Sequence, residues 1–232
     1  MTKRFYKEAA AQENDGSFTV VLDGRAIKTP AGKPLALPTL ALAEAVAEEW
    51  GGQGDEVDPN SMPLMQLCGT AIDRIPDARD AMIDGLLRYV DTDLLCYRAS
   101  SPQDLVARQA KVWQPLLDWA KETFGADLKV VEGVIPVSQD NSCKHGFASA
   151  MAGMDNWQLT ALAEMVGVAG SIVVGFAMFA GALDGDQAFK VVHVDEDHQI
   201  ELWGEDAEAT ERRENVRAEL KTAVQFRELL DA

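Results

Sequence analysis

The sequence is poor in cysteine. Cys68, Cys96 and Cys143 are the only three among 232 residues, and no two of them are close together. An odd number of widely spaced cysteines excludes a disulfide framework and any CxxC metal or redox motif. We therefore expect a fold that is stabilised by its hydrophobic core and that works in a reducing compartment.

Basic residues are also scarce. The chain has 21 Lys and Arg against 38 Asp and Glu, so its formal net charge is −17. A negative field of this size repels phosphate backbones and anionic lipid. We expect no nucleic-acid partner and no stable membrane insertion, and a charged protein partner is expected to be basic.

We expect neither a targeting segment nor a membrane span. The N-terminus, MTKRFYKEAA, lacks the apolar core of a signal peptide and becomes acidic too early for a transit peptide. One uncharged run, residues 165–183, has about the length of a membrane span. It contains four glycines, and neither flank carries Lys or Arg. We expect this run to form closely packed helices inside a helical core.

Motifs of the common enzyme classes are absent. The chain contains no GxGxxG, GxxxxGK[ST], GxSxG or HExxH pattern, so we expect no catalytic residues and no nucleotide hydrolysis. The alternative is a small metal-dependent hydrolase that uses His193, Asp195 and His198, because imidazole and carboxylate groups bind transition metals. A catalytic metal usually needs three fixed protein ligands, and no third histidine lies nearby in the sequence. We therefore expect no metal site.

The first 60 residues are predicted to form a small domain that contains strands. Alternating residues 18–22 indicate a strand, and Asp23-Gly24 predicts a two-residue hairpin turn that places Val20 opposite Ile27. Pro38 and Thr39 then begin a helix that ends at the glycines from residue 51 onward. These signals indicate antiparallel strands followed by a helix over residues 1–60.

Residues 61–232 are predicted to be a larger, all-helical domain. Apolar residues follow the helical period, and every proline lies at or before Pro136. Residues 127–132 are a candidate strand that returns to the N-terminal domain. The predicted fold class is therefore α+β, with a small strand-containing N-terminal domain and a larger helical C-terminal domain.

The acidic charge is concentrated near the C-terminus. Residues 184–211 contain ten acidic side chains and one basic one, Lys190, with Leu202 and Trp203 among them. Either Trp203 is an interface anchor with a charged rim, or it lies in the core while the carboxylates solvate the surface. Glu196 is expected to be exposed, because Asp195 and Asp197 flank it and burial of all three needs several partners.

A series of short motifs extends from residue 4 to residue 213. The series comprises residues 4–7, 22–25, 27–30, 49–50, 53, 62–64, 70–74, 92–98, 113–115, 195–196, 199, 203–204 and 212–213. In this order the motifs resemble the assembly chaperone family of the ATP synthase catalytic head (F1-ATPase), in the branch that binds the alpha subunit. Residues 137–153 contain no motif of the series.

The resemblance implies a chaperone rather than an enzyme. It implies that the chain binds the free alpha subunit, shields its beta-facing interface from aggregation and releases it into the complex, without a cofactor. We expect a monomer in the bacterial cytoplasm, or in the mitochondrial matrix if the chain is a processed one. Within the C-terminal motif, we expect the alpha subunit to contact Asp195, Glu196, Gln199, Trp203 and Glu205.

Overall fold

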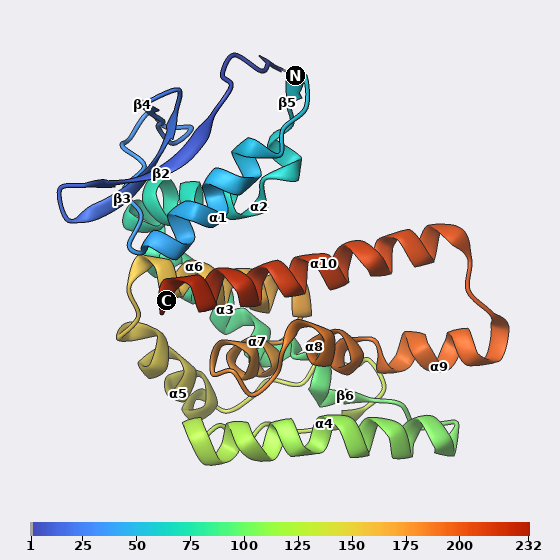
Figure 1. Cartoon of the computed structure of the whole chain (residues 1–232). Helices are drawn as coiled ribbons and strands as arrows, with labels where there is room; N and C mark the ends of the chain where they lie inside the picture. Colours follow the sequence, from blue (N-terminus) through green and yellow to red (C-terminus); the bar gives the residue numbers. More distant parts are fainter. Residues whose placement is uncertain (1) are drawn as a thin grey trace. The chain divides into compact units, whose positions relative to one another are not determined.

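The computed structural model describes residues 2–232, and its contacts divide the chain into two compact units (Figure 1). Unit 1 runs to Arg79 and includes residues 155–161 and 225–232, and unit 2 comprises residues 80–154 and 162–224. The α+β fold class with a helical C-terminal part is confirmed. The sequence predicted a domain boundary near residue 60, whereas the contacts extend unit 1 to Arg79. Local sequence patterns indicate where helices and strands lie, but not which of them pack together.

A three-stranded antiparallel sheet forms part of unit 1. It contains β2 (Ala9–Asn14), β3 (Ser17–Leu22) and β4 (Arg25–Ala26). Both turns are Asp-Gly pairs with positive φ, the backbone that two-residue hairpins require. The predicted register is confirmed, since Leu22 pairs with Arg25 and the Ile27 amide donates to the Val20 carbonyl at 3.0 Å. β2 was not predicted, because its sequence AAAQEN is alanine-rich and does not alternate.

Helix α1 (Leu40–Gly51) packs against β2 and β3; all three are drawn in shades of blue in Figure 1. Thr39 begins the helix as predicted, because its hydroxyl accepts a hydrogen bond from the Leu42 amide at 3.1 Å. A second small sheet pairs β1 (Thr2–Lys3) with β5 (Glu56–Val57). The chain continues through η1 (Pro59–Ser61), α2 (Pro63–Gly69), the π-helical turn η2 (Thr70–Arg74) and α3 (Ile75–Thr92).

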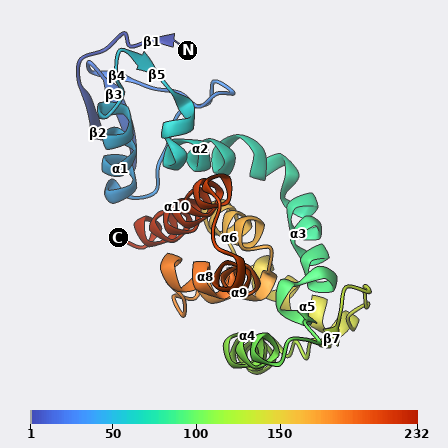
Figure 2. The ribbon, with the colours of Figure 1, turned by 90° about the vertical axis from the view of Figure 1, so that its right-hand side faces the viewer.

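Unit 2 is almost entirely helical (Figure 2). From the end of α3 the chain runs through η3 (Leu94–Cys96), β6 (Tyr97–Arg98), α4 (Gln103–Phe124), β7 (Val131–Glu132), α5 (Asn141–Ala152), α6 (Asn156–Ala169), α7 (Ile172–Phe179), α8 (Gly185–Val192), α9 (Val194–Trp203) and α10 (Ala207–Leu230). β7 pairs in parallel with β6. The expectation that residues 127–132 return to the N-terminal sheet is therefore wrong.

The uncharged run at residues 165–183 forms the end of α6 and all of α7. Gly170 has a φ of 63°, and the Ser171 hydroxyl begins α7 by accepting from the Val174 amide at 3.1 Å. A Cβ at Gly175 would lie 2.4 Å from a methyl carbon of Val166, so the two helices approach closely, as predicted. Across residues 2–232, none of the helices combines the length and the apolarity that a bilayer crossing needs.

Residues 137–153, which matched no motif, contain α5 and help to build the core of unit 2. A Cβ at Gly146 would lie 2.1 Å from the Phe124 carbonyl oxygen, so only glycine allows α5 to approach the end of α4 this closely. The rings of Phe124, Phe147 and Phe176 cluster with centroids 4.8–5.3 Å apart. The segment therefore has a packing role.

Candidate functional site

One face of helix α9 is fixed to helix α4. The polar residues on this face recur every third position, a spacing that places them on one side of a helix. Three pairs join the two helices: Gln109 to Asp195 at 2.6 Å, Asp104 to His198 at 3.0 Å, and Arg108 to Glu201 at 2.6 and 2.8 Å. The hydrogen bond from His198 lowers the pKa of Asp104, and the one from Arg108 lowers the pKa of Glu201. These contacts fix the rotation of α9 about its own axis.

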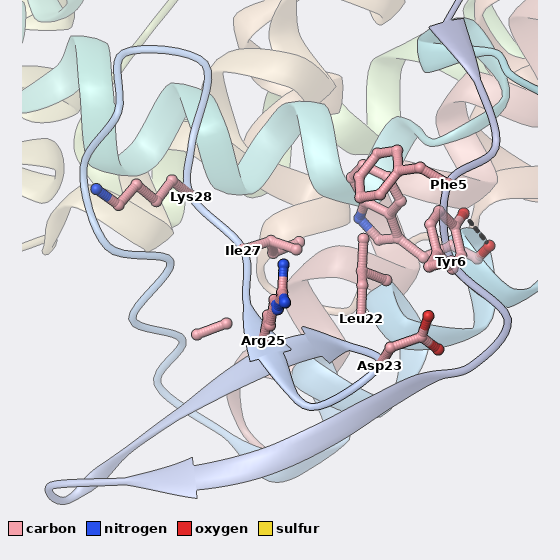
Figure 3. Close-up of a pocket in the computed structure, with 9 residues that line it drawn as sticks. Phe5, Tyr6, Leu22, Asp23, Arg25, Ile27 and Lys28 are labelled. Carbon is pink, nitrogen blue, oxygen red and sulfur yellow. Dashed lines mark hydrogen bonds between the residues drawn. The ribbon is translucent and has the colours of Figure 1, made fainter.

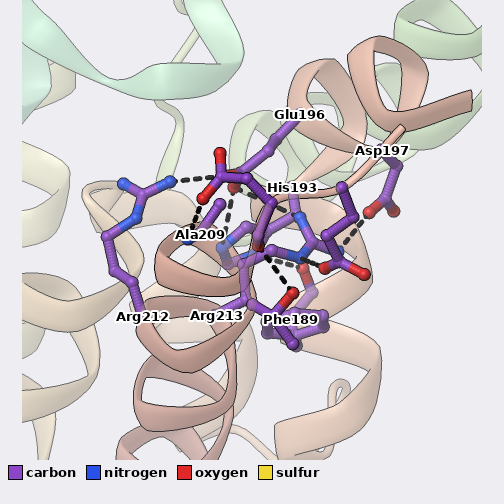
Figure 4. Close-up of polar contacts among 10 residues, drawn as sticks. Phe189, His193, Glu196, Asp197, Ala209, Arg212 and Arg213 are labelled. Carbon is purple, nitrogen blue, oxygen red and sulfur yellow. Dashed lines mark hydrogen bonds and ion pairs between the residues drawn. The ribbon is translucent and has the colours of Figure 1, made fainter. Parts of the chain in front are cut away.

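A second face of α9 is tied to α10 by Arg213 (Figure 4). Its guanidinium pairs with Asp197, and its Nη1 lies 3.2 Å from the Glu196 carboxylate. The same guanidinium lies 5.1 Å from the ring centroid of Phe189 in α8. The Arg213 side chain is only 12% exposed, so these charges interact away from bulk water. Arg212, which is exposed, adds a further ion pair with Glu196.

His193, between α8 and α9, completes this cluster. Its ring stacks on Phe189 with centroids 4.1 Å apart, and its Nδ1 lies 2.9 Å from the Phe189 carbonyl oxygen. Its Nε2 lies 3.5 Å from Glu196. Burial lowers the pKa of His193 below its usual value of 6.5, although the contact with the Phe189 carbonyl opposes the shift.

The lowered pKa of His193 predicts a pH dependence of stability. Below about pH 6.5 the unfolded chain binds a proton at this position that the native chain accepts only at lower pH, so the free energy of unfolding decreases as the pH falls. His193→Gln should make this decrease shallower between about pH 7.5 and about pH 5.5 in urea unfolding experiments. His145→Gln, at an exposed histidine, is the matched control. Equal slopes for wild type and His193→Gln would contradict the prediction.

The third face of α9 is open to solvent. Gln199, Leu202 and Trp203 share this face at the spacing i, i+3, i+4, and Leu202 is 58% and Trp203 78% exposed. Gly204, with a φ of 84°, ends the helix, and the exposed Glu205 follows. We call Gln199, Leu202, Trp203 and Glu205 the α9 tip. The interpretation of Trp203 as a core residue is therefore wrong.

The exposure expected for Glu196 is also wrong. Its side chain is 24% exposed and is paired with Arg212 and Arg213, which lie 16 and 17 positions later in α10. Asp195 faces α4 and accepts a hydrogen bond from Gln109. Of the five expected contact residues, Gln199 and Trp203 lie on the open side, whereas Asp195 and Glu196 serve helix contacts. Glu205 is exposed as well, but its carboxylate also lies 3.6 Å from the Arg213 guanidinium. Leu202, which the expected set did not include, lies on the same open side, three positions after Gln199.

The structure gives no support to the hydrolase alternative. The three side chains contact different neighbours. His193 contacts Glu196 and Phe189, Asp195 contacts Gln109, and His198 contacts Asp104. No group of three or more His, Cys, Asp or Glu side chains within residues 2–232 is arranged to hold a metal ion.

A framework of packed helices that presents exposed apolar side chains is typical of a protein-binding surface. Comparison with known proteins shows that this chain is a member of a chaperone family. Residues 3–121, just over half of the chain, match the ATP12 chaperone protein family, and the chain belongs to this family. The resemblance to the ATP synthase assembly chaperones, which the sequence motifs predicted, is thus confirmed.

Two curated fungal relatives and two solved bacterial structures are similar to the chain. Mitochondrial atp12 of Schizosaccharomyces pombe is 26% identical, with 87% of this chain and 74% of the relative covered. Mitochondrial ATP12 of Saccharomyces cerevisiae is 22% identical, with 96% and 82% covered. The crystal structure of Atp12 from Paracoccus denitrificans has a TM-score of 0.91 and 38% identity, with 99% and 98% covered. Atu1473 from Agrobacterium tumefaciens has a TM-score of 0.90 and 40% identity, with 99% and 85% covered.

Proposed function

We propose that this chain binds the free alpha subunit of the ATP synthase catalytic head through the α9 tip. In this role it covers the beta-facing interface of the alpha subunit and releases the subunit into the complex. The observation that carries the proposal is the exposure of Leu202 and Trp203 on a helix whose other faces are fixed by α4 and α10. Membership of the chaperone family supports the assignment of the client.

The physical basis is the fate of an unassembled subunit. A subunit that waits for its neighbour exposes an apolar interface, and exposed apolar patches aggregate. A tryptophan held on a rigid helix can cover part of such a patch at a low entropic cost, because its position is set before binding. Glu205 at the rim is exposed although it also pairs with Arg213, so its carboxylate favours encounter with a basic surface and contributes mainly to the rate of association.

The remaining parts of the proposal concern what the chain needs and where it acts. A client that is covered and released requires no catalysis by the chaperone, so we propose that the chain is not an enzyme and acts as a monomer. The compartment is the bacterial cytoplasm or the mitochondrial matrix. Two relatives carry mitochondrial names, and the similar solved structures come from bacteria.

Loss of the tryptophan is expected to weaken client binding without unfolding the chaperone. Trp203→Ser should raise the dissociation constant for purified free alpha subunit about 30-fold, equivalent to about 2 kcal/mol for an interface anchor. Its melting temperature should stay close to that of the wild type, because the side chain is largely exposed. Isothermal titration calorimetry measures the first quantity and thermal unfolding the second.

Two further variants make this test specific. Trp203→Phe keeps an aromatic anchor and should retain most of the affinity, whereas Ile135→Ser removes an exposed apolar side chain from another part of unit 2 and should change little. Glu196→Lys is unsuitable as a binding test, because it places a third cation beside Arg212 and Arg213 and weakens the α9–α10 contact itself. Wild-type affinity in Trp203→Ser would refute the role of the α9 tip, and a wild-type chain that does not bind alpha subunit would refute the proposed client.

A further inference from the structure

Unit 1 contains a pocket of about 600 Å³ beside the β3–β4 turn. Its wall is mostly apolar and aromatic, and Phe5 and Tyr6 lie on one side with Ile27 opposite (Figure 3). Trp50, at the end of α1, also lines it, and the Tyr6 hydroxyl donates to the Trp50 carbonyl at 2.7 Å. Tyr6 and Trp50 are further held edge to face, with centroids 5.7 Å apart. The pocket is therefore built on side chains that hold one another in place.

The lining of the pocket has more cations than carboxylates, in contrast to the net charge of the chain. Arg25 and Lys28 line it, both are exposed, and neither makes an ion pair or a side-chain hydrogen bond with any residue from 2 to 232. Asp23 also lines it, but its carboxylate accepts hydrogen bonds from the amides of Glu8 and Lys7, and these lower its pKa. A chain with a net charge of −17 thus keeps two cations beside an aromatic pocket, neither of them in an ion pair within the described part of the chain, although Arg25 is near enough to help lower the pKa of Asp23.

The wall also contains an unused hydrogen-bond donor. The indole nitrogen of Trp50 is buried and has no acceptor among residues 2–232. A buried donor without an acceptor is costly, and a bound segment can supply the missing oxygen. Because the nitrogen has almost no exposed area, an acceptor reaches it only after a local rearrangement of side chains. Its resonance is therefore a reporter of events in the pocket.

We infer that this pocket binds a short acidic segment of the client, in which carboxylates flank an aromatic or aliphatic side chain. The apolar side chain enters between Tyr6 and Ile27, and the carboxylates pair with Arg25 and Lys28. This inference rests on the proposed function for the identity of the client, and it adds a second contact in unit 1 to the α9 tip in unit 2. An uncharged apolar segment would leave both cations unused, and a phosphate or carboxylate ion alone would leave the aromatic wall unused.

The chemistry of the pocket is tested with a defined peptide. The acetylated and amidated pentapeptide Ala-Asp-Phe-Asp-Ala is titrated into ¹⁵N-labelled full-length protein, and the five indole N–H resonances are followed by NMR. Trp50→Phe assigns the Trp50 resonance. We expect a saturable shift of this resonance at a peptide concentration of about 1 mM, with at least tenfold weaker binding when both Asp are replaced by Asn or when Phe is replaced by Ala.

The client contact is tested with purified alpha subunit. Arg25→Glu/Lys28→Glu should raise the dissociation constant at least fivefold without a change in melting temperature, because both side chains are exposed. Arg88→Glu/Lys111→Glu makes the same change of charge at exposed positions of unit 2 and should leave the affinity unchanged.

The outcomes separate this inference from the proposed function. Absence of a saturable Trp50 shift, or wild-type affinity of Arg25→Glu/Lys28→Glu for alpha subunit, overturns the inference and leaves the role of the α9 tip intact. If the wild-type chain does not bind alpha subunit, the proposed function fails and the client assignment of the segment fails with it. The peptide titration then still decides whether the pocket recognises carboxylates that flank an apolar side chain.

Discussion

Arg213→Ala is expected to lower the free energy of unfolding by about 3 kcal/mol, as measured by urea unfolding. The substitution leaves the carboxylates of Glu196 and Asp197 without their shared cation at a poorly hydrated contact. It also removes the guanidinium that lies over the Phe189 ring. Because Arg213 joins α9 to α10, the α9 tip should lose its fixed position, and the affinity for the alpha subunit should decrease as well.

Two controls separate this effect from a general effect of charge. Arg212→Ala removes an ion pair with the same Glu196, but the Arg212 side chain is 67% exposed, so the loss should stay below about 1 kcal/mol. Arg213→Lys keeps the charge and loses the planar group that contacts two carboxylates and a ring, so its stability should lie between the two alanine variants. If Arg213→Ala is no less stable than Arg212→Ala, the cluster does not fix α9.

Trp113→Ala should cost about 4 kcal/mol of unfolding free energy, within the range for removal of a large buried aromatic side chain. Trp113 lies in α4, is fully buried, and donates its indole N–H to the Val191 carbonyl at the end of α8 at 2.8 Å. The Arg98 guanidinium lies 5.2 Å from its ring centroid. The residue therefore joins α4 to the segment from which α9 starts.

Trp113→Phe distinguishes packing from hydrogen bonding at this position. Phenylalanine keeps most of the buried ring but leaves the Val191 carbonyl without its donor, so the expected loss is about 1–2 kcal/mol. Urea unfolding of both variants gives the two losses of unfolding free energy. The slope of this free energy against urea concentration should be the same as in the wild type. Equal losses for Ala and Phe would mean that the hydrogen bond, and not the packing, dominates.

Arg213 and Trp113, whose removal is expected to destabilise the chain, both help to hold helix α9 in the position that exposes Trp203. Helix α9 has a sequence in which charged residues follow one another with little amphipathic pattern, so its own sequence does not fix its orientation. Contacts with α4 and α10 use the side chains of two faces and leave the third one open. An apolar side chain that is exposed in this way stays available for a partner, because it cannot rotate into the core of its own chain.

The sequence by itself determined the features that depend on neighbouring residues. Asp23-Gly24 specifies positive φ at two consecutive positions, which fixes the hairpin and its register, and Thr39 satisfies an amide at the start of α1. Of the glycines of residues 165–183, Gly175 allows α6 and α7 to approach closely. The ordered motifs along the chain were sufficient to identify the family. The structural features depend on residues that are close in the sequence, and the family was identified from the order of the motifs along the chain.

Only the tertiary structure decided how the acidic segment is used. Ion pairs between α9 and α10 join residues 16 or 17 positions apart, and the polar contacts between α4 and α9 join residues 86–94 positions apart. No local pattern specifies such partners, because they depend on which helices meet and on how each is rotated. The same contacts placed Glu196 inside a cluster and Trp203 in solvent, although both belong to one ten-residue helix. Helix packing, rather than residue type, therefore separated the structural charges from the exposed α9 tip.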